Sequence, residues 1–287
     1  MREQCEVYLA QHLRRVRLRG TRTVPLDLTS VETLPAQMEQ YRPDAVIHTA
    51  GMSVVDQCER EPEKAREVNA VLARNVAGAA ATLGVRLIHI STDHLFGGTR
   101  SLYKEDDTPE PLNAYAQTKL LAEQWVTEAH PEALIVRTNF FGWGHRFRQS
   151  FSDWIIYSLR RGEALTLFDD VFITPTLADN LALATHRLMG RDASGIFNVV
   201  GDERVSRYEF ARRLAKVFAL PEALIRRGRI SQSNLTARRP SDMSLDNAKA
   251  RAVLGGSLGI LDEYLDGLLR QQLSKRDSEL LHAVTAG

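Results

Sequence analysis

Short apolar runs alternate with longer segments of helical periodicity from about residue 44 onward. The short runs are continuous, which is typical of strands buried on both faces of a parallel sheet. The longer segments are polar on one side and repeat their apolar residues at helical spacing. We expect strands at 44–50, 85–90 and 133–138, and helices at 62–83 and from about Tyr115 to Trp125. This order of strand, helix and strand predicts parallel βαβ units, with helices covering a buried sheet.

The alternation becomes less regular after about residue 140, where helical and extended segments are mixed. Helices are expected at 150–161, 176–189 and 206–218, and extended segments at 165–173 and 195–200. The residues from about Lys275 onward are interpreted as a solvated helix end or tail. The sequence therefore predicts an α/β protein in two interleaved parts. A Rossmann-like domain with a parallel sheet covers residues 1–142, and a smaller, mixed α/β substrate lobe covers residues 143–287.

Composition and charge exclude several classes of protein. Lys and Arg number 37 against 36 Asp and Glu, so the formal charge of +1 lacks the basic excess of a typical nucleic-acid binder. The two cysteines form no spacing typical of zinc or of a disulfide framework. No apolar stretch approaches the roughly 20 residues that span a bilayer, and the amino terminus lacks the apolar core of a signal peptide. We expect a cytoplasmic protein with no metal, no nucleic-acid partner and no membrane partner.

Candidate chemistry lies where the predicted strands end. Ligands of open parallel sheets bind outside the carboxyl ends of the strands. Ala50 and Gly51, the Ser91-Thr92-Asp93 segment, and Thr138 with Asn139 all fall at such ends. Capping of a loop or helix is the simpler role for a serine or threonine there. His48 and His89 fall within the strands and are interpreted as core histidines rather than ligands.

Tyr115 and Lys119 form the sharpest local signal. Residues four apart lie on one face of a helix, and an ammonium beside a phenol lowers the phenol pKa from near 10. A tyrosine tuned in this way serves as a general acid or base. The Tyr-x-x-x-Lys pattern alone is equally compatible with a surface pair. Its place one strand and loop after Ser91-Thr92-Asp93 makes the combination far more specific, because a hydroxyl there can bond the oxygen that the tyrosine protonates.

Three segments carry a family resemblance. They are Ile-Ser-Thr-Asp-His-Leu-Phe-Gly at 90–97, the stretch 103–119 that ends in Tyr-Ala-Gln-Thr-Lys, and Ile-Val-Arg-Thr at 135–138. They resemble the extended short-chain dehydrogenase/reductase superfamily, and within it the dTDP-4-dehydrorhamnose reductase family. The segments 48–59, 68–69 and 238–246 resemble the same family, so the resemblance runs from roughly residue 24 to 255.

The resemblance implies a catalytic triad of Thr92, Tyr115 and Lys119. The family reaction moves hydride from NADP(H) or NAD(H) to the C4 keto carbon of a nucleotide-linked 4-keto-6-deoxy sugar. Tyr115 would protonate the nascent alkoxide and Thr92 would hold that oxygen. Lys119 would lower the tyrosine pKa and bond the nicotinamide ribose.

The remaining site residues are implied in the same way. Those expected to contact the cofactor, besides Tyr115 and Lys119, are Asp27, Leu28, Ala50, Gly51, Asn139 and Phe140. Small residues at 50 and 51 leave room for the cofactor to pass close to the backbone. The candidates for substrate contact are Asp93, His94, Gln149 and Arg239. A guanidinium matches phosphate oxygens bidentately, so Arg239 would meet a diphosphate, with an ordinary surface arginine as the equal alternative.

The sequence departs from the family pattern at its beginning and at one site residue. A Rossmann chain opens with a strand, a glycine-rich turn and a helix that receive the pyrophosphate, whereas no glycine precedes Gly20 here. The segment 6–10 would be the family's second strand, or 7–18 the remains of its first helix. Without the central first strand, two sheet edges are exposed. Separately, His94 stands where the family has tyrosine, which bears on sugar selectivity and leaves the triad alone.

Two explanations for the missing turn stay open. The start codon is assigned too late, which we favour, or the protein is truly shortened and its cofactor binding is compromised. Two other functions stay open as well. One is a nucleotide-sugar epimerase, and the other is a non-catalytic or regulatory protein like the β subunit of methionine adenosyltransferase. The sequence leaves the oligomeric state open, with a homodimer among the options.

Overall fold

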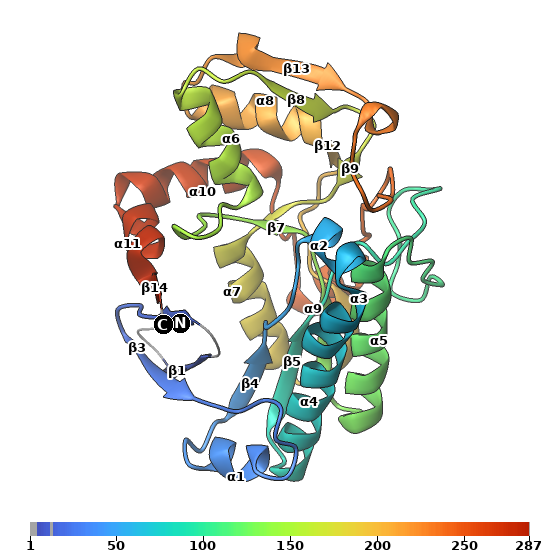
Figure 1. Cartoon of the computed structure of the whole chain (residues 1–287), viewed down its shortest axis with the longest axis vertical. Coiled ribbons are helices and arrows are strands. Elements are labelled where there is room, and N and C mark those ends of the chain that lie inside the picture. Colours follow the sequence, from blue (N-terminus) through green and yellow to red (C-terminus); the bar gives the residue numbers. More distant parts are fainter. Residues whose placement is uncertain (1–4, 12–13, 287) are drawn as a thin grey trace.

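A four-stranded parallel sheet lies at the centre of the lower part of the molecule (Figure 1). The computed structural model describes residues 5–11 and 14–286. The strands, in spatial order, are β11 (Gly195–Asn198), β6 (Leu134–Arg137), β5 (Arg86–Ile90) and β4 (Ala45–His48). The three strands expected at 44–50, 85–90 and 133–138 are confirmed, and with them the α/β class.

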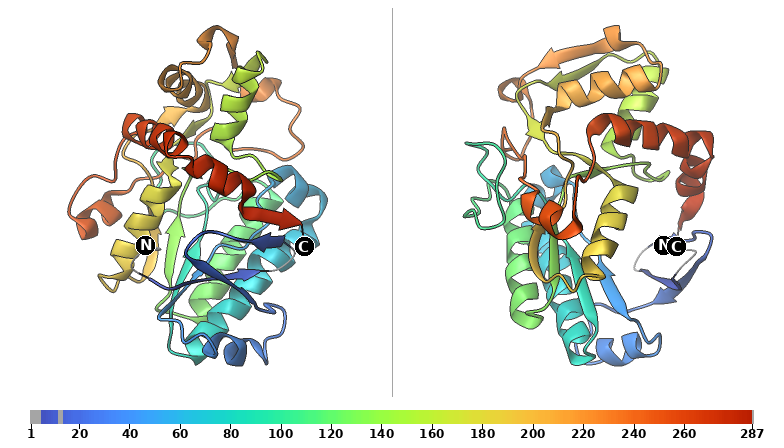
Figure 2. Two further views of the ribbon diagram at one scale, coloured as in Figure 1. Left: turned by 90° about the vertical axis from the view of Figure 1, so that its left-hand side faces the viewer. Right: turned by 180° about the vertical axis from the view of Figure 1, so that it is seen from behind.

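Helices cover both faces of this sheet (Figure 2). One face packs against α1 (Leu34–Glu39), α4 (Leu72–Thr82) and α5 (Ala114–Ala129), and the other against α7 (Ala178–Met189) and α9 (Ala248–Leu254). Successive strand residues alternate between the two faces because the side-chain period of a strand is two. Leu87 packs on the α4 and α5 side, and its neighbour Ile88 on the α7 and α9 side. This double burial explains the continuous apolar runs in the sequence.

The helical segment expected at 62–83 is interrupted by one wider turn. It consists of α3 (Pro62–Arg66), a π-helical turn η1 (Glu67–Val71) and α4. Such turns within α-helices are frequent at functional sites. Here the turn contains the fully buried Asn69, whose Oδ1 accepts a hydrogen bond of 2.6 Å from Met52 N in the loop after β4.

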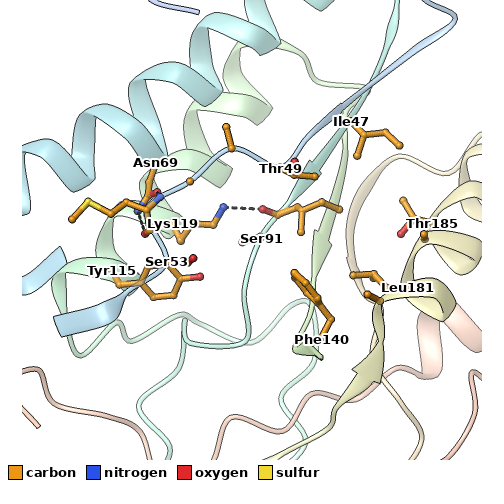
Figure 3. Close-up of a pocket in the computed structure, with 16 residues that line it drawn as sticks. Ile47, Thr49, Ser53, Asn69, Ser91, Tyr115, Lys119, Phe140, Leu181 and Thr185 are labelled. Atoms are coloured by element: carbon orange, nitrogen blue, oxygen red, sulfur yellow. Dashed lines mark hydrogen bonds between the residues drawn. The ribbon is translucent and has the colours of Figure 1, made fainter. Parts of the chain in front are cut away.

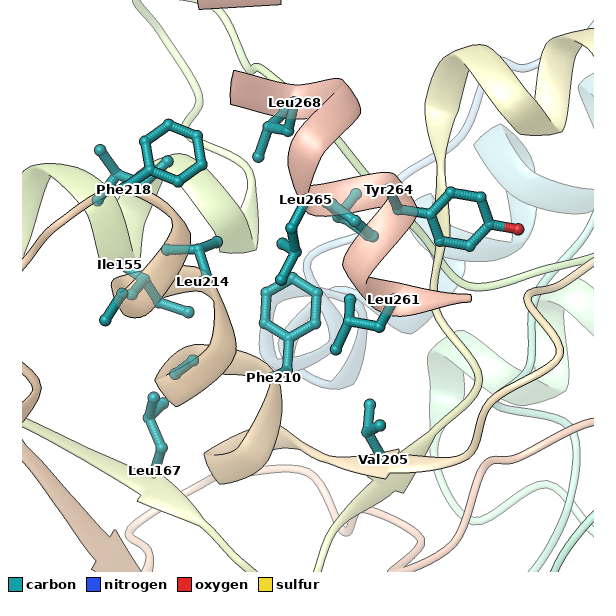
Figure 4. Packing of buried hydrophobic residues seen from close by; sticks show 14 of the residues in the cluster. Ile155, Leu167, Val205, Phe210, Leu214, Phe218, Leu261, Tyr264, Leu265 and Leu268 are labelled. Carbon is teal, nitrogen blue, oxygen red and sulfur yellow. The ribbon is translucent and has the colours of Figure 1, made fainter. Parts of the chain in front are cut away.

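The upper lobe has its own apolar core, shown in Figure 4. Its helices are α6 (Phe151–Arg160), α8 (Arg207–Val217) and α10 (Leu261–Leu273). Its strand pairs are β8 (Leu165–Phe168) with β13 (Ile225–Gly228), β9 (Phe172–Ile173) with β12 (Val205–Ser206), and β7 (Phe140–Phe141) with β10 (Thr176–Leu177). Phe210 is fully buried at the centre, in an edge-to-face contact with Phe141. Because β11, α7 and α9 return to the sheet after residue 143, the two parts are interleaved.

Both chain ends form strands. β1 (Val7–Gln11) pairs in parallel with β3 (Thr21–Pro25) in a sheet separate from the central one. The segment is therefore a strand and not the remains of a helix, and its place as the family's second strand stays a prediction. Within the described part of the chain, β4 has β5 as its single partner, and Ile47 is 47% exposed at this edge.

The expectation of a solvated tail after Lys275 is wrong for the last residues. α11 (Arg276–Ala283) leads into β14 (Val284–Ala286), which pairs antiparallel with β2 (Arg14–Val16). Ala283 and Val284 are buried. Pairing satisfies the backbone groups of two short strands that are remote in sequence, a contact that local patterns do not reveal.

Short helical segments complete the chain. They are α2 (Val55–Arg60) after β4, and the 3₁₀ turns η2 (Glu222–Leu224) and η3 (Ile230–Gln232) in the upper lobe. No helix in residues 5–11 or 14–286 is both long and apolar enough to cross a membrane.

The core of the upper lobe offers a stability test with a matched control. Leu214→Ala removes a fully buried side chain from α8 and is expected to lower the free energy of unfolding by about 2–5 kcal/mol. Leu273→Ala in α10, where the side chain is 76% exposed, should change it by less than about 0.5 kcal/mol. Urea unfolding measures both, and equal losses in the two variants would contradict the packing described here.

Candidate active site

A cavity of about 300 Å³ lies at the carboxyl ends of β4 and β5 (Figure 3). Its lining combines the loop after β4, the end of β5, the start of α5, and residues of β7 and α7. Predicted site residues in this lining are Ala50, Gly51, Tyr115, Lys119 and Phe140. These residues are far apart in the sequence and meet here because the parallel strands end at the same edge of the sheet.

Helix α5 positions the two residues of the Tyr-x-x-x-Lys pattern. The helix begins where the side chain of Asn113 accepts a hydrogen bond of 2.9 Å from Ala116 N, a typical N-cap. One turn apart, Tyr115 and Lys119 face the same cavity, as the spacing predicts. Lys119 Nζ donates a bond of 2.8 Å to the Ile90 carbonyl at the end of β5.

The expected lowering of the Tyr115 pKa is not found. Burial raises the pKa of Tyr115 to about 12, although a hydrogen bond with the Thr92 side chain acts in the opposite direction. The Lys119 amine is engaged with the Ile90 carbonyl and lies 3.3 Å from His89 Nε2. Burial lowers the pKa of Lys119 to about 8, with Glu123 opposing the shift. Tyr115 therefore keeps its proton at neutral pH, and Lys119 is the more acidic of the two groups.

Thr92, Asp93 and His94 follow β5 and lie behind Tyr115, outside the residues that line the cavity. The Thr92 hydroxyl lies 3.3 Å from Asp93 Oδ1, and Asp93 Oδ2 accepts a bond of 2.5 Å from Asn139. Burial raises the pKa of Asp93 to about 6. The His94 ring stands edge-on to Tyr115 at 5.5 Å, and burial lowers its pKa to about 3, so the imidazole is neutral. Its Nδ1 is buried with no partner among the residues described.

Two arginines place positive charge near Thr92, Asp93 and His94. Arg239 Nη2 lies 3.0 Å from Asp56 Oδ1, and its side chain is 15% exposed. Arg207, the first residue of α8, stacks over the Phe151 ring at 5.0 Å. Its guanidinium makes no hydrogen bond or ion pair within the described part of the chain, and burial together with Arg239 lowers its pKa while Asp93 raises it. A largely buried cation without an ion-pair partner favours an anionic ligand.

A buried ion pair fixes α5 to the sheet. Arg137 of β6 donates to both carboxylate oxygens of Glu123, the shortest bond being 2.8 Å, and both side chains are 3% exposed. The Ser91 hydroxyl donates a further bond of 2.5 Å to the same carboxylate. Neither this pair nor Arg207 follows from local sequence patterns, because their contacts depend on how α5 packs on the sheet and how the upper lobe packs beside it.

Some predicted site residues lie away from the cavity. Asp27 accepts hydrogen bonds from the Thr29 backbone and hydroxyl in the loop after β3, and Leu28 packs beside the core under α4. Gln149 is exposed. Asn139 turns toward Asp93 instead of the cavity. Their predicted roles toward cofactor and substrate remain predictions. No group of three or more His, Cys, Asp or Glu suited to a metal occurs among the described residues.

A parallel α/β sheet, with a hydroxyl residue ending one strand and a Tyr–Lys pair on the next helix, defines the short-chain dehydrogenase/reductase class. Over residues 6–272 the chain matches the family described as RmlD substrate binding domain, and it belongs to that family. The family and the Rossmann-like fold expected from the sequence are thereby confirmed.

Three comparisons illustrate the likeness. The chain is 32% identical over 248 residues to the probable low-salt glycan biosynthesis reductase Agl14 of Haloferax volcanii, covering 85% of this chain and 82% of the other. It is 30% identical to methionine adenosyltransferase 2 subunit beta of Rattus norvegicus, over 78% and 69% of the two chains. The structure of dTDP-4-dehydrorhamnose reductase from Bacillus anthracis in complex with NADP superposes with a TM-score of 0.81 at 26% identity, covering 88% and 90%.

The buried ion pair generates a second stability test. Glu123→Gln leaves the Arg137 charge buried without its counter-charge, and is expected to cost about 3–5 kcal/mol of unfolding free energy. Glu163→Gln breaks the Arg161–Glu163 pair, whose side chains are about half exposed, and should cost far less because water screens an exposed pair. Chemical denaturation of both variants decides the matter. A small loss at Glu123 would mean that the pair does not fasten α5.

Proposed function

We propose that this protein is an NAD(P)H-dependent reductase of the C4 keto group of a nucleotide-linked 4-keto-6-deoxy sugar. The observation that carries the proposal is the meeting of Tyr115 and Lys119 at one cavity, with the Thr92 side chain hydrogen-bonded to Tyr115. The likeness to a reductase solved with NADP supports the choice of cofactor. The likeness to Agl14, named as a reductase of glycan biosynthesis, supports the choice of reaction class.

The lining of the cavity fits the nicotinamide half of such a cofactor. Ile47, Phe140 and Leu181 offer apolar surface for a flat ring, and Phe140 is 55% exposed toward it. A Cβ added at Gly51 would approach Asn69 Oδ1 to 3.2 Å, so the loop after β4 is already tightly packed without a side chain there. When bound, the cofactor supplies the hydride. Lys119 would bond its ribose, and Asp27 and Leu28 remain our candidates near its adenine.

Tyr115 acts as the general acid in this proposal. Its pKa of about 12 keeps the phenol protonated at neutral pH, so it has a proton to give to the alkoxide that hydride transfer creates. The Thr92 hydroxyl, bonded to Tyr115, is placed to hold the same oxygen. Lys119, with the lower pKa of about 8, can return a proton to the phenolate.

The substrate would lie between the sheet and the upper lobe. Arg207 and Arg239 supply the positive charge that a nucleoside diphosphate needs, because guanidinium groups bind phosphate oxygens bidentately. Asp93 and His94 remain our candidates for contacts to the sugar. Gln149 remains a candidate contact on the exposed loop before α6.

A second candidate function is a regulatory or non-catalytic binding protein, favoured by the match to methionine adenosyltransferase 2 subunit beta. Such a protein would bind dinucleotide or nucleotide sugar without turnover. An epimerase would turn over substrate without net oxidation of the cofactor. A measurement of net cofactor oxidation therefore distinguishes both alternatives from a reductase.

That measurement follows the loss of NADPH or NADH absorbance with a dTDP-linked 4-keto-6-deoxy sugar as substrate. We expect substrate-dependent oxidation, and a fall in kcat of about 10²- to 10⁴-fold in Tyr115→Phe, because general acid catalysis is lost. Tyr157→Phe, on α6, serves as the matched control and should keep full activity. Binding of the cofactor without oxidation would favour the regulatory function, and full activity in Tyr115→Phe would remove the mechanism.

Arg207 offers a separate test of the substrate. Arg207→Met is expected to raise KM for the nucleotide sugar by about 10- to 100-fold, since a hydrogen bond to a charged group contributes about 1.5–3 kcal/mol. Arg212→Met lies on the same helix, where Arg212 is paired with Glu222 at the surface, and should leave KM unchanged. Steady-state kinetics of both variants would show equal KM values if Arg207 has no part in binding.

A further inference from the structure

A short helix, α2, lies where the sheet-bearing part of the molecule meets the upper lobe (Figure 1). Its Asp56 contacts the segment of the chain that carries Arg239. Asp56 Oδ1 accepts a hydrogen bond of 2.9 Å from Ala237 N and lies 3.0 Å from Arg239 Nη2. The mechanism proposed above uses Arg239 and gives no role to Asp56.

The backbone of the segment 237–241 is fastened to the sheet-bearing part at two further points. Arg238 O accepts a bond of 2.8 Å from Asn113 Nδ2, and Ser241 Oγ donates a bond of 2.9 Å to Gly98 O. The backbone before and after Arg239 is therefore held in place. The direction of the Arg239 side chain then depends on what its guanidinium contacts.

The Arg239 guanidinium is held by two contacts and keeps donors for a ligand. Besides the ion pair with Asp56, its Nη1 donates a bond of 3.3 Å to Ala237 O. A guanidinium has five N–H groups, so these two contacts leave donors for phosphate oxygens. The side chain is 15% exposed, so a ligand in solution can reach it. Asp56 thus orients the guanidinium without burying it completely.

The same helix also contacts the elements that carry the active site. One turn further along, Glu59 Oε2 accepts a bond of 2.9 Å from Ala114 N, directly before Tyr115. Between the two carboxylates, the buried thiol of Cys58 donates a bond of 3.2 Å to the carbonyl of Met52, which lines the cavity. α2 therefore joins the upper-lobe segment to the start of α5 and to the loop after β4.

We propose that Asp56 is a positioning residue that holds Arg239 in the orientation that binds the diphosphate of the substrate. The proposal rests on the proposed function, because the diphosphate belongs to the nucleotide-linked sugar. Asp56 acts through Arg239 and does not touch the substrate. A sugar that lacks the diphosphate gains nothing from this contact, so the pair selects sugars that are linked to a nucleotide.

The contribution of Asp56 is to order the guanidinium before the ligand binds. Ordering one long side chain at the moment of binding weakens affinity by about 2- to 10-fold, and an ion pair formed in advance avoids this loss. Asp56→Asn keeps an oxygen for Ala237 N but removes the negative charge that attracts Arg239. The substitution therefore separates the hold on the guanidinium from the hold on the backbone.

Calorimetric binding of dTDP to the full chain tests the proposal without turnover. We expect Kd to rise about 10- to 100-fold in Arg239→Met and about 2- to 10-fold in Asp56→Asn. The double variant should have the Kd of Arg239→Met, because Asp56 acts only through that side chain. Glu61→Gln, directly after α2, is the matched control, since Glu61 pairs with Lys64 at the surface, and it should leave Kd unchanged.

Two calorimetric results would overturn the proposal. Losses that add in the double variant would mean that Asp56 acts independently of Arg239. Tighter binding of dTDP by Asp56→Asn would mean that the carboxylate competes with the phosphates for the guanidinium instead of orienting it.

Steady-state kinetics supply the second arm. Asp56→Asn should raise KM for the nucleotide sugar about 2- to 10-fold and leave kcat and KM for the cofactor unchanged. A merely structural role would loosen α2 and with it the loop after β4, so a rise in KM for the cofactor as well would contradict the proposal.

The two arms separate this proposal from the proposed function. The expected changes in dTDP affinity without reductase activity would contradict the proposed function alone. Reductase activity with an unchanged dTDP affinity in Asp56→Asn would contradict the positioning role alone. No binding of dTDP to the unaltered protein would contradict both.

Discussion

The buried ion pair between Glu123 and Arg137 is the constraint on which the site depends. It fastens α5 to β6, and through the Ser91 hydroxyl it also holds the end of β5. Tyr115, Lys119 and Glu123 follow one another at intervals of four on this helix, so docking one of them aligns the others. The Tyr–Lys pair is thus positioned by a helix packed on a sheet, which holds reactive groups more firmly than loops do.

Burial also decides which group carries the proton. Transfer of a charge out of water is unfavourable, so a buried phenol resists ionisation and a buried amine resists protonation. These effects move the Tyr115 pKa up to about 12 and the Lys119 pKa down to about 8. Tyr115 consequently keeps its proton in the resting state, which suits the general acid proposed above, and Lys119 is the more acidic of the two groups. Burial is the largest cause of the Tyr115 shift, and it outweighs the lowering that the spacing alone predicts.

Local sequence patterns could predict the parts of the fold that are set by period and spacing. The strand that ends at Ile90 and the shared face of Tyr115 and Lys119 follow from alternation and from the four-residue repeat. Arg207 could not be found in this way, because its place beside Asp93 results from the upper lobe folding over the sheet. The pairing of β14 with β2 is likewise a contact between opposite ends of the chain.

The histidines show a different limit of sequence reasoning. An interpretation of His48 and His89 as core residues is correct about their burial, since strand position predicts it. It does not reveal that they face each other, because that depends on the register between β4 and β5. A shift of one residue in either strand would send the two rings to opposite faces.

The side of the site formed by the sheet and the side formed by the upper lobe differ in polarity. On the sheet side the cavity is lined by apolar groups such as Ile47 and Phe140, which suit a flat ring. On the lobe side the largely buried charges are Arg207 and Arg239. Tyr115 stands between the two, beside the neutral ring of His94. In the proposed function, a hydride donor against the apolar side and a phosphorylated acceptor beside the arginines would use both environments, with the proton donor where they meet.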